Sequence, residues 1–240
     1  MLITGFAAGV FATNCWIVAD RPGADAVIVD PGQDAAPAVA ELVSEHDLHP
    51  VAVLLTHGHL DHTWDAVAVC EQYGIPAYIH PADRAMLSDP AAGIGPALSS
   101  LIGDLTFSEP EKVIDFVDGE AVELAGIRFD VDAAPGHTRG SVLLSTTVVT
   151  DDADVPVCFA GDVLFAGSIG RTDLPGGDHQ QLLDSIAATL LTRTDDTQVL
   201  PGHGPQTTVG RERATNPFLA GLPGSRPDAA SHPTKGRHGL

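Results

Sequence analysis

The stretch THGHLDHTWDA, residues 56–66, places three histidines and one aspartate within six positions. They are His57, His59, Asp61 and His62. A chain of this composition produces the pattern HxHxDH by chance only about once in several hundred chains. The stretch directly follows VAVLL at 51–55, a wholly apolar run that is typical of a buried strand. We therefore expect the cluster on the loop that leaves the C-terminal end of this strand, where α/β sheets usually carry their sites.

Three further segments each carry one metal-capable residue on a glycine-marked turn that follows an apolar run. They are APGHTRGS with His137, FAGDVLF with Asp162 and LPGHGPQ with His203. Imidazole and carboxylate are the ligands that Zn²⁺ prefers at an open hydrolytic site, and turn glycines allow several loops to converge on one point. All four segments lie at the ends of predicted strands, so the sequence predicts a metal site assembled from distant parts of the chain.

The rest of the chain alternates between strand-like and helix-like segments. Strands are expected at 2–6, 13–19, 25–30, 51–55, 77–80, 112–133, 142–149, 155–160 and 197–200. Apolar residues at helical spacing predict helices at 34–46, 64–73 and 179–191. Residues 81–110, rich in Pro and Gly, are expected to form short helices and loops as an insertion near the site, plausible as a lid. We expect one domain over 1–220 and a flexible tail over 221–240, which has almost no large apolar residues.

Composition and charge restrict the class of protein. With 44% hydrophobic and 18% charged residues, the 240-residue chain is typical of a globular protein. A formal charge of −20 argues against nucleic acid and anionic membranes as partners. The first twenty residues lack the features of a secretory signal, so a soluble, cytoplasmic protein is expected. Three cysteines in apolar surroundings, Cys15, Cys70 and Cys158, are expected to be buried, reduced thiols.

These motifs together resemble the metallo-β-lactamase superfamily, and most of all its glyoxalase II-like (hydroxyacylglutathione hydrolase-like) branch in a single-domain form. The resemblance runs from residue 1 to about residue 220. It includes VDPG at 29–32 and GSIGRTDLPGGD at 167–178. It implies an α/β fold, a four-layer αββα sandwich, with metals at one edge between two mixed sheets.

The resemblance also implies two groups of metal ligands. The first ion would be held by His57, His59 and His137. The second would be held by Asp61, His62 and His203, with Asp162 bridging the two ions. Asp61 would in addition orient a metal-bound hydroxide, and Asp30 would orient the ligand loop from behind. The expected cofactors are two divalent metal ions, Zn before Fe or Mn.

The chemistry expected of such a site is hydrolysis of a small thioester. Two ions can share a water molecule and lower its pKa from about 15.7 towards 7, and the resulting hydroxide attacks the carbonyl carbon. The departing thiolate has a pKa near about 8.5 and needs little protonation. Because two dications favour anions, an anionic thioester such as S-lactoylglutathione is expected. Only 37 residues follow His203, so the helical glutathione-binding domain of full-length glyoxalase II enzymes is largely missing, and the thiol carrier stays open among glutathione, mycothiol, bacillithiol and coenzyme A.

Two alternatives remain open. A persulfide dioxygenase of the same superfamily keeps HxHxDH and has a GRTD segment, but uses one iron ion held by fewer residues. The intact LPGHG turn at His203 favours two metals and hydrolysis. A non-catalytic metal-binding protein predicts lost ligands, and none is lost. A secreted β-lactamase is disfavoured by the missing signal segment, and an RNA-processing nuclease by charge and length. Oligomeric state is left undetermined.

Some polar residues near these motifs have two interpretations. Arg171, which follows Asp162 in the chain, either binds a substrate carboxylate or pairs with Asp173 to brace its loop. Asn14 and Cys15 are interpreted as packing residues. Thr138, Arg139 and Ser141 are expected to support the ligand turn. Solvated or structural roles are expected for the remaining histidines that resemble ligands: His46, His49, His80 and His179.

Overall fold

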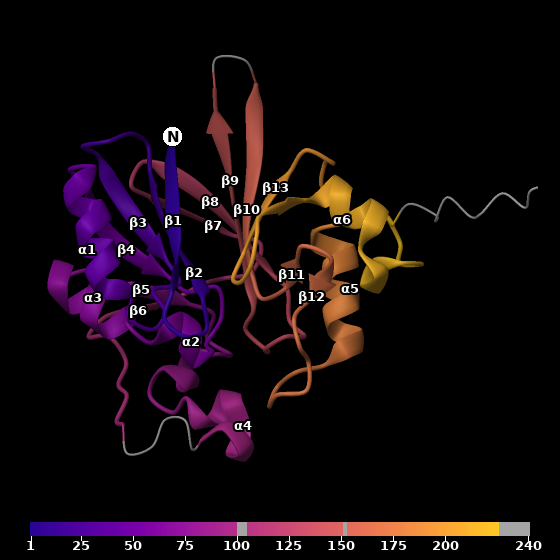
Figure 1. Ribbon diagram of the computed structural model, residues 1–240, viewed down its shortest axis with the longest axis horizontal. Coiled ribbons are helices and arrows are strands. Elements are labelled where there is room, and N and C mark those ends of the chain that lie inside the picture. Colours follow the sequence, from indigo (N-terminus) through magenta and orange to yellow (C-terminus); the bar gives the residue numbers. More distant parts are fainter. Residues whose placement is uncertain (100–104, 151–152, 226–240) are drawn as a thin grey trace, which may run out of the picture.

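Two six-stranded sheets pack face to face in the computed structural model, which describes residues 1–99, 105–150 and 153–225 (Figure 1). The first sheet has the strands in chain order: β1 (Leu2–Ala8), β2 (Thr13–Ala19), β3 (Asp25–Val29), β4 (His49–Leu54), β5 (Ala77–Ile79) and β6 (Val113–Asp115). The second has the order β14 (Thr207–Thr208), β13 (Gln198–Pro201), β10 (Asp154–Gly161), β9 (Val142–Val149), β8 (Ile127–Ala133) and β7 (Ala121–Leu124). Both sheets contain parallel and antiparallel pairs.

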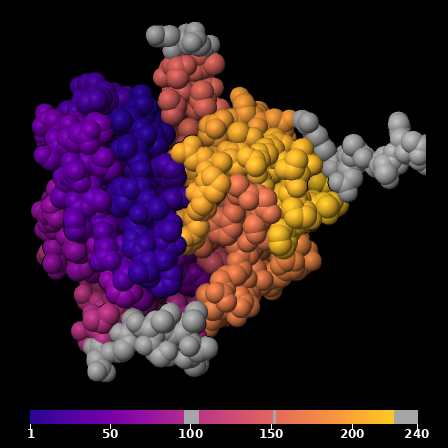
Figure 2. All heavy atoms as spheres, in the orientation of Figure 1, coloured from indigo at the N-terminus to yellow at the C-terminus, as the bar shows by residue number. Residues whose placement is uncertain are grey.

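Helices cover the outer face of each sheet. α1 (Ala35–Glu45) and α3 (Ala66–Tyr73) pack on the first sheet, and α5 (His179–Thr189) and α6 (Val209–Thr215) pack on the second. Adjacent residues of β2 illustrate why the strands are buried on both faces: Ile17 packs towards the helices and Val18 towards the other sheet. The predicted four-layer αββα sandwich is confirmed, and Figure 2 shows its N-terminal and C-terminal halves meeting along a seam.

Several shorter elements complete the fold. They are α2 (Leu60–Thr63), η1 (Arg84–Leu87), α4 (Ala91–Ser99), β11 (Leu164–Phe165), β12 (Ser168–Ile169) and η2 (Pro217–Leu219). Asp61 and His62 lie on α2, so the histidine motif starts on a loop and ends in a short helix. The helix expected over 64–73 begins only at Ala66, because Asp65 accepts a hydrogen bond from Ala36 N (2.8 Å) and donates its own N–H to Pro31 O (3.0 Å).

The segment after the last predicted strand contains structure that the sequence did not predict. α6 has no apolar stripe: Val209 packs in the core, and the other buried residue of the helix is Glu212. The Glu212 carboxylate accepts hydrogen bonds from Thr207 Oγ1 (2.5 Å), Gly167 N (2.7 Å) and Asn216 Nδ2 (2.9 Å). Leu222 packs against the core beneath α5 and α6. The predicted tail beyond residue 225 and part of the 81–110 insertion, residues 100–104, lie outside the described residues.

Within the described ranges, no helix combines the length and apolar character that a bilayer crossing demands. The expectation of buried cysteines is confirmed for all three, and none forms a disulfide.

Burial should make these thiols chemically inert. It raises the pKa of Cys70 to about 12, and it also raises the pKa of Cys15 and Cys158. Since the thiolate is the reactive form, we expect the native protein to release almost no thionitrobenzoate from Ellman's reagent at pH 8 within an hour. The same protein in denaturant should titrate three thiols, and fast labelling of the native state would contradict this prediction.

Candidate metal centre

Five histidines and two aspartates from separate parts of the chain converge at one edge of the sandwich, where β4, β10 and β13 end. These side chains form three groups, and within each group the potential ligand atoms all lie within 4.8 Å of one another. They are His57, His59 and His137; His57, His62 and Asp162; and Asp61, His62 and His203. These are the seven residues that the sequence motifs indicated as ligands. None of His46, His49, His80 and His179 belongs to these groups.

The first group consists of histidines alone. His137 Nε2 lies 2.9 Å from His59 Nδ1 and 3.2 Å from His57 Nε2. The group that contains His203 combines two histidines and a carboxylate: His203 Nε2 lies 3.1 Å from Asp61 Oδ2 and 3.3 Å from His62 Nε2.

Asp162 lies between these two groups. Its Oδ1 is 3.3 Å from His62 Nε2, and its Oδ2 is 3.6 Å from both His137 Nε2 and His203 Nε2. One carboxylate therefore faces ligand atoms of both groups. This is the position that a bridging ligand requires.

Hydrogen bonds at the outer side of the rings determine which nitrogen faces the centre. His137 Nδ1 donates to Arg171 O (2.8 Å), and His203 Nδ1 donates to Phe11 O (3.1 Å). A carbonyl oxygen can only accept, so these Nδ1 atoms carry a proton and Nε2 is the nitrogen that each ring turns towards the centre. The centre thus brings ring nitrogens into close contact, an arrangement that a cation between them would stabilise.

Asp30 completes this outer shell of hydrogen bonds. Its Oδ2 lies 3.0 Å from His62 Nδ1 and accepts the hydroxyl proton of Thr56 (2.6 Å), while its Oδ1 accepts from Thr56 N (2.8 Å). Thr56 Oγ1 can in turn accept from His57 Nδ1 at 3.2 Å. The φ angle of Asp30 is 50°, a left-handed conformation that is unfavourable for a residue with a side chain. These hydrogen bonds offset that cost and fix two of the inward-facing rings.

Two further observations show that these imidazole and carboxylate groups suit metal ions. Asp162 Oδ1, which faces the ligand nitrogens, is buried without a hydrogen-bond partner among the described residues. Burial lowers the pKa of His59 to about 3, with His137 adding to the effect, and burial likewise lowers the pKa of His57. Burial opposes ionisation of Asp162, but His62 and its other neighbours hold the pKa of that carboxyl below its usual range. His57 and His59 are therefore neutral and Asp162 ionised, which is the state that binds divalent cations. Against the effect of burial, neighbouring carboxylates raise the pKa of His62 and His203, so a metal ion would have to displace protons from these two rings.

Glycine is required where the turns meet the ligands. A Cβ on Gly202 would overlap Asp162 Oδ1 and His62 Cε1, and a Cβ on Gly170 would overlap the carbonyl oxygen of Asp162. The glycines of LPGHG and GSIG thus permit the close approach of backbone and ligand that the sequence led us to expect.

Gly202→Ala should therefore displace the ligands without removing any of them. We expect the affinity for metal to fall by about tenfold or more, because the added methyl group occupies the space of the Asp162 carboxylate. Metal titration monitored by calorimetry measures the effect, and unchanged affinity in Gly202→Ala would contradict the steric argument.

Gly204→Ala, two positions further on, is the control for changes in the same turn. A Cβ added at Gly204 would meet no atom within 4 Å among the described residues. Because Gly204 has a φ angle of 73°, which is unfavourable for alanine, this control is scored on metal affinity and not on stability.

Asp83 is a structural residue of the site that no sequence motif marks. It is 1% exposed, and it accepts hydrogen bonds from Gly58 N (2.9 Å), Gly140 N (2.7 Å) and Thr138 Oγ1 (2.6 Å). Gly58 stands between His57 and His59, and Thr138 follows His137. Asp83 therefore joins the two loops that carry the first group of histidines, although it lies in the segment expected to form an insertion.

Asn14 has a larger role than the packing role predicted for it. Its Nδ2 donates to Pro201 O (3.0 Å) and Gly204 O (2.9 Å), and its backbone N–H donates to Gly202 O (2.7 Å). Asn14 thus holds the turn that carries His203 against the start of β2. The supporting roles expected of Thr138 and Ser141 are seen in their mutual hydrogen bond (2.7 Å).

One of the two interactions considered for Arg171 is present in the structure. Its guanidinium donates to both carboxylate oxygens of Asp173, at 2.8 Å each, and both side chains are exposed. The pairing with Asp173 is therefore present, and the contribution of Arg171 to the centre is its carbonyl oxygen, which accepts from His137.

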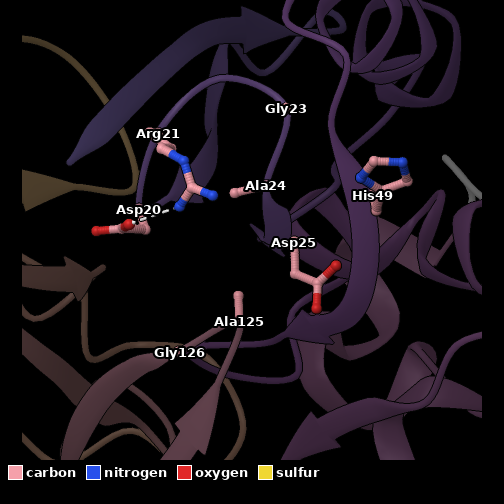
Figure 3. A pocket seen from close by; sticks show the side chains of 8 residues that line it. All are labelled: Asp20, Arg21, Gly23, Ala24, Asp25, His49, Ala125 and Gly126. Atoms are coloured by element: carbon pink, nitrogen blue, oxygen red, sulfur yellow. Dashed lines mark hydrogen bonds and ion pairs between the residues drawn. The ribbon is translucent and has the colours of Figure 1, made fainter.

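A cavity of about 580 Å³ opens over the centre. His59, Asp61, His137, Asp162 and His203 line it together with mostly apolar side chains. A second hollow of about 620 Å³ lies at the opposite end of β3 and β4 and is lined by Asp20, Arg21, Asp25 and His49, among others (Figure 3). None of the candidate ligands lines this second hollow, whereas five of them line the first cavity.

Comparison with known proteins identifies relatives over nearly the whole chain. A family model described as the metallo-beta-lactamase superfamily matches residues 8–203. A protein of Mycobacterium tuberculosis is 51% identical over 223 residues, 92% of this chain and 99% of the relative. The hydroxyacylglutathione hydrolase GloC of Haemophilus influenzae is 35% identical over 214 residues, 87% of this chain and 93% of that protein.

Two solved structures extend the comparison. The B3 metallo-beta-lactamase BLEG-1 is 38% identical with a TM-score of 0.80, and the match covers 92% of this chain and 100% of that one. TTHA1623, solved in a di-iron-bound form, is 34% identical with a TM-score of 0.72 over 90% of this chain and 100% of that one. The sequence and structural matches thus agree on one family.

Proposed function

The chain belongs to the metallo-beta-lactamase superfamily, and from this premise we propose that it is a binuclear metal-dependent hydrolase that cleaves a small thioester. The observation that carries the proposal is the position of the Asp162 carboxylate between the two ligand groups. The superfamily consists mostly of metal-dependent hydrolases, and a relative that is 35% identical is named a hydroxyacylglutathione hydrolase. Both observations support hydrolysis at a carbonyl group.

Each of these two ligand groups is assigned to one metal ion. His57, His59 and His137 would hold one ion; Asp61, His62 and His203 would hold the other; and Asp162 would contact both. Two divalent cations supply Lewis acidity, which lowers the pKa of a water molecule and polarises a carbonyl group. Asp61, whose side chain is 22% exposed and lines the cavity, can accept a hydrogen bond from that water and orient it. The buried histidines exclude bulk solvent from the inner side.

The metals proposed are zinc ions, with iron as the alternative. A ligand set of five imidazoles and two carboxylates suits both, and a neighbour with 34% identity is known in a di-iron-bound form. We also propose a cytoplasmic location, supported by three thiols that are buried and not in disulfides.

A panel of thioesters, run with elemental analysis of the same sample, tests the proposal. We expect about two metal ions per chain and release of free thiol, with S-lactoylglutathione as the reference substrate. One iron per chain together with oxygen uptake on a persulfide would replace the proposal by the dioxygenase alternative. Full metal loading without turnover of any substrate would support the non-catalytic alternative.

A second candidate activity is hydrolysis of a β-lactam, favoured by the 38% identity to BLEG-1 over its whole chain. The same attack on a carbonyl carbon would open the four-membered ring. Nitrocefin hydrolysis distinguishes this candidate, and a kcat/KM higher for nitrocefin than for every thioester would favour it.

A further inference from the structure

The walls of the cavity above the metal centre are apolar. Eight of the side chains that line it are hydrocarbon or aromatic groups: Val10, Phe11, Leu60, Trp64, Ile94, Phe165, Ile169 and Leu174. They come from the β1–β2 turn, α2 and the residue after it, α4, the β11–β12 hairpin and the loop that follows. Elements from both halves of the sandwich therefore turn apolar groups towards one space, which is the usual construction of a site for an apolar ligand.

Two of these side chains are unusually exposed for their type. Val10 is 81% exposed and Phe11 is 43% exposed, at the tip of the β1–β2 hairpin. The hairpin is tied to the centre, because Phe11 O accepts the Nδ1 proton of His203 at 3.1 Å. The ring of Phe165 lies 6.2 Å from the imidazole of His203, centroid to centroid. We call Val10, Phe11 and Phe165 the apolar wall. A ligand group that contacts it would lie next to the group of metal ligands that contains His203.

Charged recognition of the substrate is weak in the same cavity. Among the lining residues that the structure describes, Arg171 is the one with a guanidinium side chain, and no lysine is present. The Nε–Nη2 edge of its guanidinium binds Asp173, through two hydrogen bonds of 2.8 Å each, and this ion pair offsets the positive charge of Arg171. Because Asp173 already offsets the charge of Arg171, an anionic carrier would gain little attraction from this side chain, and it would approach a chain of formal charge −20.

We propose that the substrate of this site is an uncharged thioester whose acyl chain is apolar and lies against Val10, Phe11 and Phe165. This inference rests on the thioester hydrolysis proposed above, and it replaces the anionic substrate expected from the sequence. Water forms the new C–O bond, the C–S bond breaks, and the products are a carboxylic acid and a thiol. The apolar wall contacts the acyl chain of the substrate, which the reaction leaves unchanged.

A homologous series of substrates tests the inference. The probes are the acetyl, butyryl, hexanoyl and octanoyl thioesters of N-acetylcysteamine, which carry no charge, with S-lactoylglutathione as the charged comparison. Burying one CH₂ group is worth about 0.8 kcal/mol, so kcat/KM should rise by about fourfold per CH₂ until the cavity is filled. We expect the hexanoyl ester to be cleaved faster than S-lactoylglutathione.

The outcomes separate this inference from the proposed function. Equal rates along the series, or faster cleavage of S-lactoylglutathione than of the hexanoyl ester, would overturn the inference and leave thioester hydrolysis standing. Failure of the metal-loaded protein to cleave any of these thioesters would remove the proposed function itself.

A pair of double variants tests the apolar wall directly. Val10→Ser with Phe11→Ser should reduce the ratio of kcat/KM for hexanoyl over acetyl by about tenfold or more, mainly through KM, because the acyl chain loses its contact surface. The matched control is Val149→Ser with Phe218→Ser, which removes one valine and one phenylalanine of similar exposure, 70% and 47%, neither of which lines this cavity. An unchanged ratio in the first variant would overturn the role of the wall.

Binding without turnover gives an independent measurement. The thioether S-hexyl-N-acetylcysteamine cannot be hydrolysed, and Trp64 in the cavity reports its binding by fluorescence, whereas Trp16 is packed between the sheets. We expect tighter binding of this thioether than of S-hexylglutathione. The reverse order would contradict an uncharged substrate.

Discussion

Asp162→Ala will lower kcat/KM for thioester hydrolysis by about a hundredfold or more while the protein remains folded. The carboxylate faces histidines of both ligand groups, so its removal should disturb both ions at once. His59→Ala should have an effect of the same order, because the Nδ1 atom of His59 completes the first group at 2.9 Å from His137. The measurements are steady-state kinetics, metal content and circular dichroism of each variant.

The controls are exposed residues of the same types on α5. Asp184→Ala and His179→Ala remove an aspartate and a histidine outside all three candidate ligand groups, and both should keep the activity of the parent protein. If Asp162→Ala or His59→Ala kept more than about a tenth of the parent activity, the ligand assignment would be wrong.

Asp83→Asn should have the second largest effect, although Asp83 does not touch the centre. In the variant, the amide NH₂ group replaces one carboxylate oxygen and faces either Gly58 N–H or Gly140 N–H. Both groups are hydrogen-bond donors, so a buried hydrogen bond is lost and the two donors are left without an acceptor. We expect the free energy of unfolding to fall by about 2 kcal/mol. The affinity for metal should fall by about 10- to 100-fold, since the two loops that carry His57, His59 and His137 lose their common anchor.

Calorimetric metal titration and urea denaturation of the metal-free protein measure the two effects separately. Asp89→Asn, an exposed aspartate of the same segment, is the control. A loss of stability without any change in metal affinity would mean that Asp83 stabilises the fold and does not position the ligands.

The seven candidate ligands could be found from the sequence because each lies beside a strong local signal. Apolar runs mark the ends of β4, β10 and β13, and glycines mark the turns, so the chemistry and the approximate place of each residue follow from local patterns. The four-layer fold was expected from the resemblance of these motifs to the superfamily, and the local signal covered only the strands. Strands such as β2 are buried on both faces, so most of their residues are apolar, and a short apolar run in the sequence reveals such a strand.

Contacts between distant polar groups could not be predicted in this way. Asp83 and Glu212 are buried acids whose partners are far along the chain, and α6 has no apolar periodicity to reveal it. Asn14 bonds with the turn of His203 across nearly the whole sequence. A hydrogen bond depends on direction and distance in space, and neither leaves a periodic trace in the chain.

The sequence by itself determined which side chains can bind metal and which strands bring them to one edge, because residue chemistry and hydrophobic periodicity are local properties. The tertiary structure decided how those side chains are oriented and what surrounds them. Only folding places the Asp162 carboxylate between two sets of nitrogens, pairs Arg171 with Asp173 and brings the Phe11 carbonyl oxygen and the Phe165 ring to His203. These features arise from the packing of segments that are remote in sequence, so the orientation of the ligands and the character of the cavity belong to the fold.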